Sequence, residues 1–426
     1  MSLTLSVKDI QGILQPDEAV VVYMTGEKNG LVLAVSKEAA SWSRLSGNIQ
    51  TLSDRVREFR NGLDPDALRA SAVSGKPQLF DLQRSHDLYL TLVAPVEDVL
   101  RGKRRINVVP DGPLTSLPFH LLITERPATA VLPLKDIAQY RDQAWLLRQA
   151  AIKIVPAVSN LQAAREAGAN SRAPRTMIAF GDPIFNPVER KRTLAEAASG
   201  NKRPATTTRA YTSIWQGAGI DRNRLRDALP TLLDSGQEVR NIGRKLGIPE
   251  SDVLVEGNAT EANVKRRPLN EYQIVYFATH GLVAGDVKGL AEPSLALTIP
   301  DASSEEDDGI LTLSEVSTLK LNADLVVLSA CNTIAGDRPG AEALTGLAKA
   351  FFYAGAKAMI VSHWALASDA ATKIMTDTFG LVQADPSLDR AEALRRAMLD
   401  YMNDRSNPLN GYPAYWAPFV VVGGGG

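Results

Sequence analysis

Runs of aliphatic residues alternate with amphipathic segments along this chain, and this pattern predicts its elements. In the first part it predicts strands at 20–24, 31–35, 88–93 and 106–109, and helices at 38–60 and 65–72. In the second part it predicts strands at 176–180, 252–255, 274–278, 295–298, 325–329, 359–362 and 419–422, and helices at 235–246, 260–268, 341–353, 368–381 and 389–402. Strands of near-continuous Val, Ile and Leu separated by helices are typical of a parallel sheet covered on both faces. We therefore predict an α/β protein.

A polar stretch divides the chain into two predicted domains. Residues 166–175 separate an N-terminal α/β unit at 1–165 from a second unit at 172–426. Two domains are also what a length of 426 residues leads us to expect. The segment 189–224 is poor in large aliphatic side chains and rich in Thr, Ala, Arg and Asn, so we predict a long surface excursion there.

The charge balance argues against a nucleic-acid partner. The 47 basic and 48 acidic side chains are well mixed and leave a net charge of −1, so no strongly basic face is expected. The N-terminal residues lack the pattern of a signal peptide, and no apolar run reaches the ~18 residues needed to cross a bilayer. We therefore expect a soluble protein that does not contact membranes.

The cysteine content narrows the chemistry. Cys331 is the only cysteine, so no intramolecular disulfide can form, and a reducing, cytoplasmic compartment is expected. Zinc sites built from several thiolates are excluded. No glycine-rich phosphate loop or cluster of metal ligands is evident, and we expect no cofactor. Any Cys/His chemistry must draw on four histidines, which are His86, His120, His280 and His363.

Cys331 and His280 occupy equivalent positions after two predicted strands. Cys331 follows the strand 325–329, and His280 follows the strand 274–278, 51 positions earlier (331 − 280). Because ligands bind at the carboxyl ends of strands in open α/β sheets, one sheet edge can bring the imidazole and the thiol together. A nearby imidazole raises the thiolate fraction of a cysteine, whose ordinary pKa is about 8.5. Gly281 can offer its backbone N–H to a developing oxyanion.

A structural interpretation of the same two residues stays open. A free cysteine at a strand end is commonly a small buried hydrophobe, and a single histidine is commonly a hydrogen-bonded residue of the core or the surface. The matched placement and a spacing close to the roughly 50 residues of caspases make the catalytic interpretation as good as the structural one. Spacing alone does not decide between them.

Several blocks of sequence follow one another in a recognisable order. They lie at 108–114, 117–119, 276–281, 311–316, 328–333, 346–351, 353–356, 362–364 and 415–419. These blocks resemble those of CHAT domains, which are caspase-like peptidases found mostly in bacteria, often behind tetratricopeptide repeats, and similar to separase. The resemblance covers most of the chain and is densest between 272 and 422.

This resemblance implies a caspase-like fold and a cysteine endopeptidase. His280 and Cys331 would form the catalytic dyad, and backbone groups of Gly281 and Cys331 would hold the oxyanion. The unit at 1–165 would be a related but non-catalytic unit, as in separase-like relatives. The implied partners are a protein substrate and a sensor or tetratricopeptide-repeat regulator that gates activity. The side chains implied as candidates for the substrate pocket are Asn332, His363, Trp364 and Asp369.

The chain departs from the family pattern in three respects. Relatives usually carry an acidic residue a few positions after Trp364, where this chain has Ala367, so the role of that acid in the pocket is in doubt. Ser329 stands where caspases carry Gln before Ala-Cys, so a preference for aspartate does not follow. No tetratricopeptide array precedes the blocks, and we expect either a stand-alone form or a piece of a longer protein.

These departures leave other functions open. One alternative is a catalytically silent pseudo-peptidase that serves as an interaction module, and another is a non-proteolytic hydrolase or acyltransferase that uses the same dyad. For His363, packing beside Trp364 is the simpler interpretation. The acidic run 305–308 lies between the strands that precede the dyad residues, and we predict a solvated loop there. In caspase-like enzymes this connection can be a processing site, so self-cleavage near the run is a further prediction.

Overall fold

Two compact units make up the described part of the chain. The computed structural model describes residues 5–65, 68, 77–166, 171–199, 225–227, 229–282, 290, 292–302, 304, 306–329, 343–364 and 368–424. The first unit contains the described residues up to 166 and those from 384 onward, and the second contains those between. Within these ranges no helix has the length and apolar character that a membrane span requires.

The first unit is built on a six-stranded sheet with the order β3-β2-β1-β4-β5-β14. The strands β1, β4, β5 and β14 are parallel, whereas β2 and β3 are added to one edge as antiparallel strands. Its strands are β1 (Glu18–Thr25), β2 (Gly30–Ser36), β3 (Ala40–Leu45), β4 (Arg105–Val109), β5 (Ala151–Ile154) and β14 (Phe419–Gly423). Its α-helices are α1 (Val7–Ile13), α2 (Ile49–Phe59), α4 (Leu82–Leu92), α5 (Glu97–Leu100), α6 (Leu146–Gln149), α7 (Val158–Glu166), α15 (Arg390–Asn403) and α16 (Pro413–Trp416). Its 3₁₀ helices are η1 (Ala94–Val96), η2 (Gly112–Ser116), η3 (Phe119–Leu121), η4 (Leu134–Asp142) and η7 (Pro408–Gly411).

Two predictions for this unit are wrong. The helix predicted at 38–60 is a strand, β3, followed by the shorter helix α2, because Leu33 and Trp42 pair across β2 and β3. The strand predicted at 88–93 is the end of α4, which begins at the N-cap Asp81. The buried residues of α4 recur at helical spacing, but the window 88–93 is too short to reveal that period. Most of the helix predicted at 65–72 lies outside the described residues.

The C-terminal residues belong to the first unit, whereas the sequence pattern placed them with the second. Strand β14 pairs with β5 through Val421 and Lys153. The Lys153 ammonium lies 2.9 Å from the carboxylate of Asp389, the N-cap of α15. His120 is buried in the same unit, and its Nε2 lies 2.8 Å from the carbonyl oxygen of Ala417. These contacts span hundreds of positions, so no local pattern predicts them.

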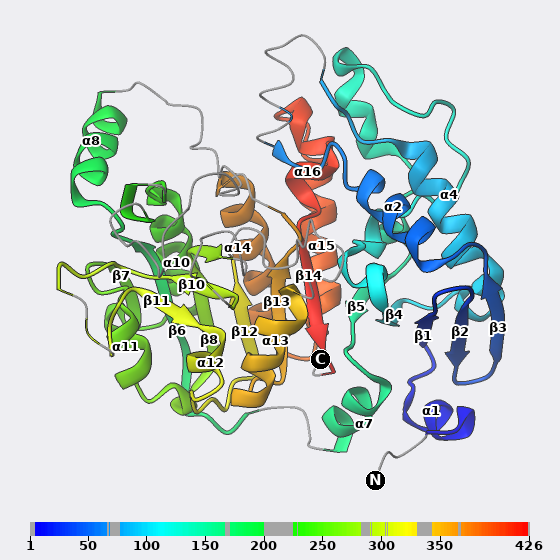
Figure 1. The fold of residues 1–426 in the computed structure, drawn as a ribbon, viewed down its shortest axis with the longest axis horizontal. Helices are drawn as coiled ribbons and strands as arrows, with labels where there is room; N and C mark the ends of the chain where they lie inside the picture. Colours follow the sequence, from blue (N-terminus) through cyan, green and yellow to red (C-terminus); the bar gives the residue numbers. More distant parts are fainter. Residues whose placement is uncertain are drawn as a thin grey trace. The chain divides into compact units, whose positions relative to one another are not determined.

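The second unit contains a five-stranded parallel sheet with the order β13-β12-β8-β6-β7 (Figure 1). A small antiparallel sheet, β9-β10-β11, follows β8 in the chain. The strands are β6 (Arg175–Pro183), β7 (Val253–Glu256), β8 (Tyr272–Ala278), β9 (His280–Leu282), β10 (Ser294–Ala296), β11 (Ile310–Thr312), β12 (Leu325–Leu328) and β13 (Ala358–Ser362). The helices are α8 (Pro187–Ala198), α10 (Leu233–Leu246), η5 (Glu250–Asp252), α11 (Glu261–Arg266), η6 (Leu269–Glu271), α12 (Leu313–Val316), α13 (Ala343–Ala354) and α14 (Ser368–Ala384).

Helices cover both faces of this parallel sheet. Successive strand residues point to opposite faces. On β8, the Tyr276 ring contacts Phe379 of α14, with centroids 6.1 Å apart, and its hydroxyl donates to Glu238 of α10. The Phe277 ring contacts Phe351 of α13, with centroids 5.8 Å apart. The predicted parallel α/β architecture with helices on both faces is therefore confirmed.

The excursion predicted at 189–224 begins instead as the helix α8. Asn186 caps this helix, because its side-chain oxygen accepts the N–H of Val188 at 3.0 Å and that of Glu189 at 3.2 Å. Arg190 is buried and makes two contacts of 2.6 and 2.7 Å with the carboxylate of Asp182. The helix is therefore held by its N-cap and by an ion pair to a residue outside the helix, rather than by an apolar stripe. Residues 200–224 lie outside the described part of the chain.

Candidate active site

Three strands of the second unit end at one edge of its sheet. Leu328 of β12 pairs with Phe277 of β8 on one side and with Val361 of β13 on the other. Because the strands are parallel, their carboxyl ends lie at the edge where ligands bind in open α/β sheets. His280 comes directly after β8 and Thr279, and His363 comes directly after β13.

The strand register also links His280 and Cys331, because each follows one of two paired strand residues by the same number of positions. Phe277 and Leu328 are paired, and each lies three positions before one of these residues (277 + 3 and 328 + 3). Ser329 extends the ladder by one residue, because its N–H donates to the carbonyl oxygen of Phe277 at 2.9 Å. Cys331 itself lies outside the described residues. The described strand therefore leads to within two positions of the cysteine.

The His280 side chain is buried and held by a backbone carbonyl. Its exposed fraction is 1%, and its Nε2 lies 2.9 Å from the carbonyl oxygen of Pro230. Because a carbonyl oxygen can only accept, Nε2 carries the proton and Nδ1 of the neutral ring keeps its lone pair. Burial lowers the pKa of His280 to about 4, and the hydrogen bond to Pro230 opposes that shift only in part. The imidazole is therefore neutral near pH 7 and can accept a proton at Nδ1.

Sequence reasoning missed the group that orients His280, because that group is a main-chain carbonyl. Pro230 lies just before α10, in a segment fixed by a cluster of apolar side chains. The cluster consists of Phe185, Leu225, Leu229, Leu282, Leu290, Ala296, Ile299 and Ile310. The centroid of the Phe185 ring lies 5.2 Å from that of His280. A carbonyl oxygen is present in every residue, so no motif could have identified this one.

The small sheet fixes the backbone on both sides of His280. His280 is opposite Ala296 and Gly281 is opposite Leu295 in the pairing of β9 with β10. The hydroxyl of Thr279 donates to the carbonyl oxygen of Ala296. The sequence pattern predicted a strand near β10 but none at 280–282. A three-residue strand has no periodicity of its own to detect.

Three of the side chains expected in the substrate pocket lie in the described part of the chain. His363 and Trp364 are both buried, with ring centroids 5.9 Å apart. Asp369 is exposed in the first turn of α14, where its Oδ1 accepts the N–H of Ala370 at 3.0 Å. The structure thus places His363 against Trp364 and Asp369 at the surface. Asn332 and Ala367 lie outside the described residues.

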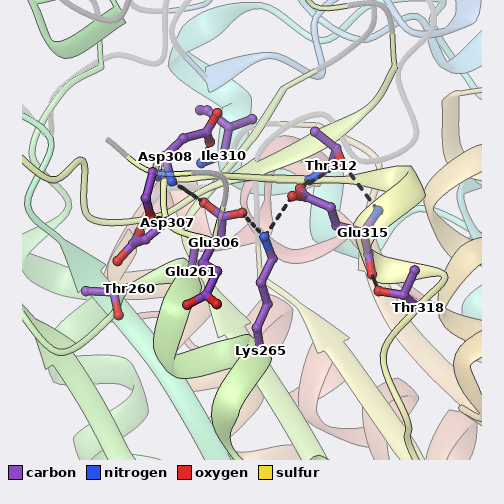
Figure 2. Close-up of polar contacts among 12 residues, drawn as sticks. Thr260, Glu261, Lys265, Glu306, Asp307, Asp308, Ile310, Thr312, Glu315 and Thr318 are labelled. Carbon is purple, nitrogen blue, oxygen red and sulfur yellow. Dashed lines mark hydrogen bonds and ion pairs between the residues drawn. The ribbon is translucent and has the colours of Figure 1, made fainter. Parts of the chain in front are cut away.

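A buried carboxylate holds the end of the acidic connection between β10 and β11. Oε2 of Glu261 accepts the N–H of Asp308 at 2.7 Å and that of Gly309 at 2.9 Å. The Lys265 ammonium lies 2.6 Å from Oε1 of Glu261 and 2.7 Å from Oε1 of Glu315, so it bridges two carboxylates (Figure 2). The run predicted as a solvated loop is therefore anchored to α11 at its carboxyl end.

Comparisons with known proteins identify relatives of the chain. A model of the CHAT domain matches residues 82–424. Tetratricopeptide repeat protein 28 of Mus musculus is 28% identical over 200 residues, which cover 40% of this chain and 8% of that protein. The chain therefore spans less than a tenth of the length of that relative.

Two solved structures also resemble the chain. The first is a separase–securin complex of Saccharomyces cerevisiae, with a TM-score of 0.46 and 11% identity, covering 97% of this chain and 30% of that chain. The second is the Arg-specific cysteine proteinase gingipain R of Porphyromonas gingivalis, with a TM-score of 0.37 and 10% identity, covering 80% of this chain and 66% of that chain. The chain thus spans less than a third of the separase chain. Because the match to the family model extends over most of its length, this chain belongs to the CHAT domain family.

Proposed function

We propose that this chain is a cysteine endopeptidase in which Cys331 is the nucleophile and His280 is the general base and acid. The observation that carries this proposal is the state of His280, a neutral imidazole at a strand end whose Nε2–H donates to Pro230 and whose Nδ1 holds a lone pair that can accept a proton. Membership of the CHAT domain family supports the same assignment. The register of β8 and β12 supports it too, because it relates the two residues by the same offset. The first unit would be the non-catalytic one.

The reaction would proceed in two steps. In the first, the Cys331 thiol transfers its proton to Nδ1 of His280, and the sulfur attacks the scissile carbonyl carbon. The backbone N–H groups of Gly281 and Cys331 hold the oxyanion. The C–N bond then breaks, and His280 returns the proton to the leaving amine. In the second step, His280 activates a water molecule that hydrolyses the thioester and regenerates the thiol.

Two features bear on regulation and specificity. The 1% exposure of His280 supports a gated enzyme, in which a sensor or a tetratricopeptide-repeat partner moves the covering residues. The similarity to a tetratricopeptide repeat protein motivates that choice of partner. The substrate would be a protein, and His363, Trp364, Asn332 and Asp369 are the proposed pocket residues.

A positional peptide library tests the proposal directly. Wild type is compared with Cys331→Ala, His280→Ala and the control His120→Gln, which changes a histidine buried in the other unit. Loss of general acid–base catalysis slows reactions by roughly 10²–10⁴-fold. We therefore expect the rate of peptide cleavage to fall by that factor in His280→Ala and to stay near the wild-type rate in His120→Gln. Cleavage that survives Cys331→Ala would overturn the proposal.

The rate of iodoacetamide alkylation of Cys331 separates a peptidase from a silent interaction module. A peptidase thiol should react faster than a free cysteine and slow down in His280→Ala. An alkylation rate equal to that of a free cysteine and unchanged in His280→Ala would instead favour the interaction module. The sequence contains no other thiol, so the signal is unambiguous.

A further inference from the structure

Asp182, near the carboxyl end of β6, has a backbone conformation that is uncommon for a residue with a side chain. Its φ is 48°, in the left-handed region, and the residue is buried. Its carboxylate is paired with Arg190 of α8, and its N–H donates to Oγ of Ser235 on α10 at 2.8 Å. Backbone strain of this kind persists where the surrounding contacts impose it, and it is concentrated at functional sites. The turn after β6 therefore calls for an explanation in terms of function.

The turn after β6 packs closely against the start of α10. A Cβ added to Gly236 would lie 2.8 Å from Cβ of Asp182, and one added to Gly181 would lie 2.9 Å from the carbonyl oxygen of Ser235, so both close approaches require glycine. Oγ of Ser235 also donates to the carbonyl oxygen of Leu232 at 2.9 Å, and the same oxygen accepts the Ser235 N–H at 3.0 Å. We call Gly181, Asp182, Ser235 and Gly236 the β6–α10 joint.

The β6–α10 joint connects the two partners of the hydrogen bond between His280 and Pro230. On one side, Gly181 is paired with Ala278 of β8, two positions before His280. On the other side, the Ser235 hydroxyl holds the carbonyl oxygen of the residue two positions after Pro230. Because His280 and Pro230 are 50 positions apart in the chain, a rigid connection is needed to keep Nε2 2.9 Å from the carbonyl oxygen.

The turn after β6 also leads the chain to the ring of His280. Phe185 follows Asp182 by three positions, and its ring centroid lies 5.2 Å from that of His280. Phe185 packs in the same apolar cluster as Leu229, which directly precedes Pro230. The segments that follow β6 and precede α10 therefore both contact His280, and the β6–α10 joint fixes them to each other.

We propose that Ser235 is a positioning residue for His280, acting through the β6–α10 joint and the carbonyl group of Pro230. This inference rests on the proposed function, because it treats His280 as the general base and acid. The Ser235 hydroxyl joins α10 to β6 by accepting the Asp182 N–H, and it fixes the turn after Pro230 by donating to Leu232. Catalytic groups must be held within about 0.5 Å of their productive geometry, and a displacement of about 1 Å can lower a rate by roughly a hundredfold.

Ser235→Ala and Ser85→Ala form a matched pair for the test. Ser85 of the first unit also accepts a backbone N–H, that of Ile123 at 2.9 Å, and donates to a carbonyl oxygen, that of Leu121 at 2.7 Å. Each variant therefore loses the same two kinds of hydrogen bond.

The exchange of the His280 Nε2–H with water is measured by NMR on isotope-labelled protein, in which the signal is identified by its absence from His280→Gln. The backbone N–H groups of β8 are the reference for opening of the whole unit. We expect Ser235→Ala to speed exchange of the Nε2–H about tenfold relative to that reference, the worth of one hydrogen bond. Ser85→Ala should change it by less than about twofold, because Ser85 has no bond to the β6–α10 joint.

Two further variants keep the test decisive. Ser235→Thr retains the hydroxyl, so exchange of the His280 Nε2–H should stay close to the wild-type rate. Gly236→Ala keeps the hydroxyl but forces α10 away from Asp182, so it should speed exchange as well, and it serves where Ser235→Ala does not fold. Equal acceleration by Ser235→Ala and Ser85→Ala, or unchanged exchange in both Ser235→Ala and Gly236→Ala, would overturn the positioning role.

Peptide cleavage gives the second measurement. A positioning residue acts on the transition state, so Ser235→Ala should lower kcat about tenfold and leave KM within about twofold of wild type. Faster exchange of the His280 Nε2–H with an unchanged kcat would overturn the role in catalysis. The exchange measurement does not involve Cys331, so failure of the proposed function is read separately, from cleavage that survives Cys331→Ala.

Discussion

The burial of His120 makes the stability of the first unit sensitive to acid. His120 is 2% exposed, and its Nε2 lies 2.8 Å from the carbonyl oxygen of Ala417. Burial lowers the pKa of His120 to about 4, from an ordinary value of 6.5, and the hydrogen bond to Ala417 opposes the shift only in part. The unfolded chain therefore binds a proton between pH 6.5 and 4 that the folded chain does not bind. For a group whose pKa is depressed in the folded state, the stabilising contribution is present above the unfolded pKa and is lost as the pH falls toward the folded pKa.

The magnitude follows from these two values. Each pKa unit corresponds to 1.36 kcal/mol. Between pH 8 and pH 5, the difference in proton occupancy of this histidine between the unfolded and folded states, integrated over pH, is about 1.5 pH units. The free energy of unfolding should therefore fall by about 2 kcal/mol through His120 alone.

Urea unfolding followed by tryptophan fluorescence measures this effect. Trp145 and Trp416 are both buried in the first unit, and the Trp416 ring centroid lies 6.5 Å from that of His120. His120→Gln removes the titrating group, so the gap in stability between wild type and variant should narrow by about 2 kcal/mol between pH 8 and pH 5. Tyr23→Phe is the control, because it removes a hydrogen bond of 3.0 Å to Leu92 in the same unit without removing a histidine. Its gap from wild type should stay constant, and a constant gap for His120→Gln as well would refute the reasoning.

Two further predictions concern the second unit. Gly355 has a φ of +114°, and an added Cβ would lie 2.3 Å from the carbonyl oxygen of Leu321, so Gly355→Ala should lower the free energy of unfolding by at least ~2 kcal/mol. Gly247→Ala, at a φ of +66° with open space around the added atom, should lower it by only ~1 kcal/mol, and equal losses in urea unfolding would contradict the steric argument. Glu261→Ala removes the acceptor of the Asp308 and Gly309 N–H groups. A glutamate-specific endoproteinase should therefore cut the variant within 301–309 several times faster than it cuts wild type, as measured by mass spectrometry of the fragments. Glu315→Ala leaves those two hydrogen bonds in place and is the control; equal cutting in both variants would show that Glu261 does not hold the connection.

The sequence by itself determined the parallel sheet of the second unit and the strand that His280 follows. Strands such as β8 and β12 are buried on both faces, so they appear as continuous apolar runs that are visible without a structure. A residue that follows such a run is expected at the carboxyl end of a strand, and this reasoning selected His280, which follows β8, and Cys331, which lies outside the described residues. Long helices such as α10 were predicted for a similar reason, because one buried face repeats over several turns.

Only the tertiary structure decided which groups hydrogen-bond to the side chains of His280 and Tyr276. Pro230 is 50 positions from His280 in the chain, and Glu238 is 38 positions from Tyr276. The C-terminal strand β14 joined the first unit through β5, against the order of the chain. Hydrophobic periodicity is a local property that reports which face of an element is buried, and it carries no information about which distant group packs against that face.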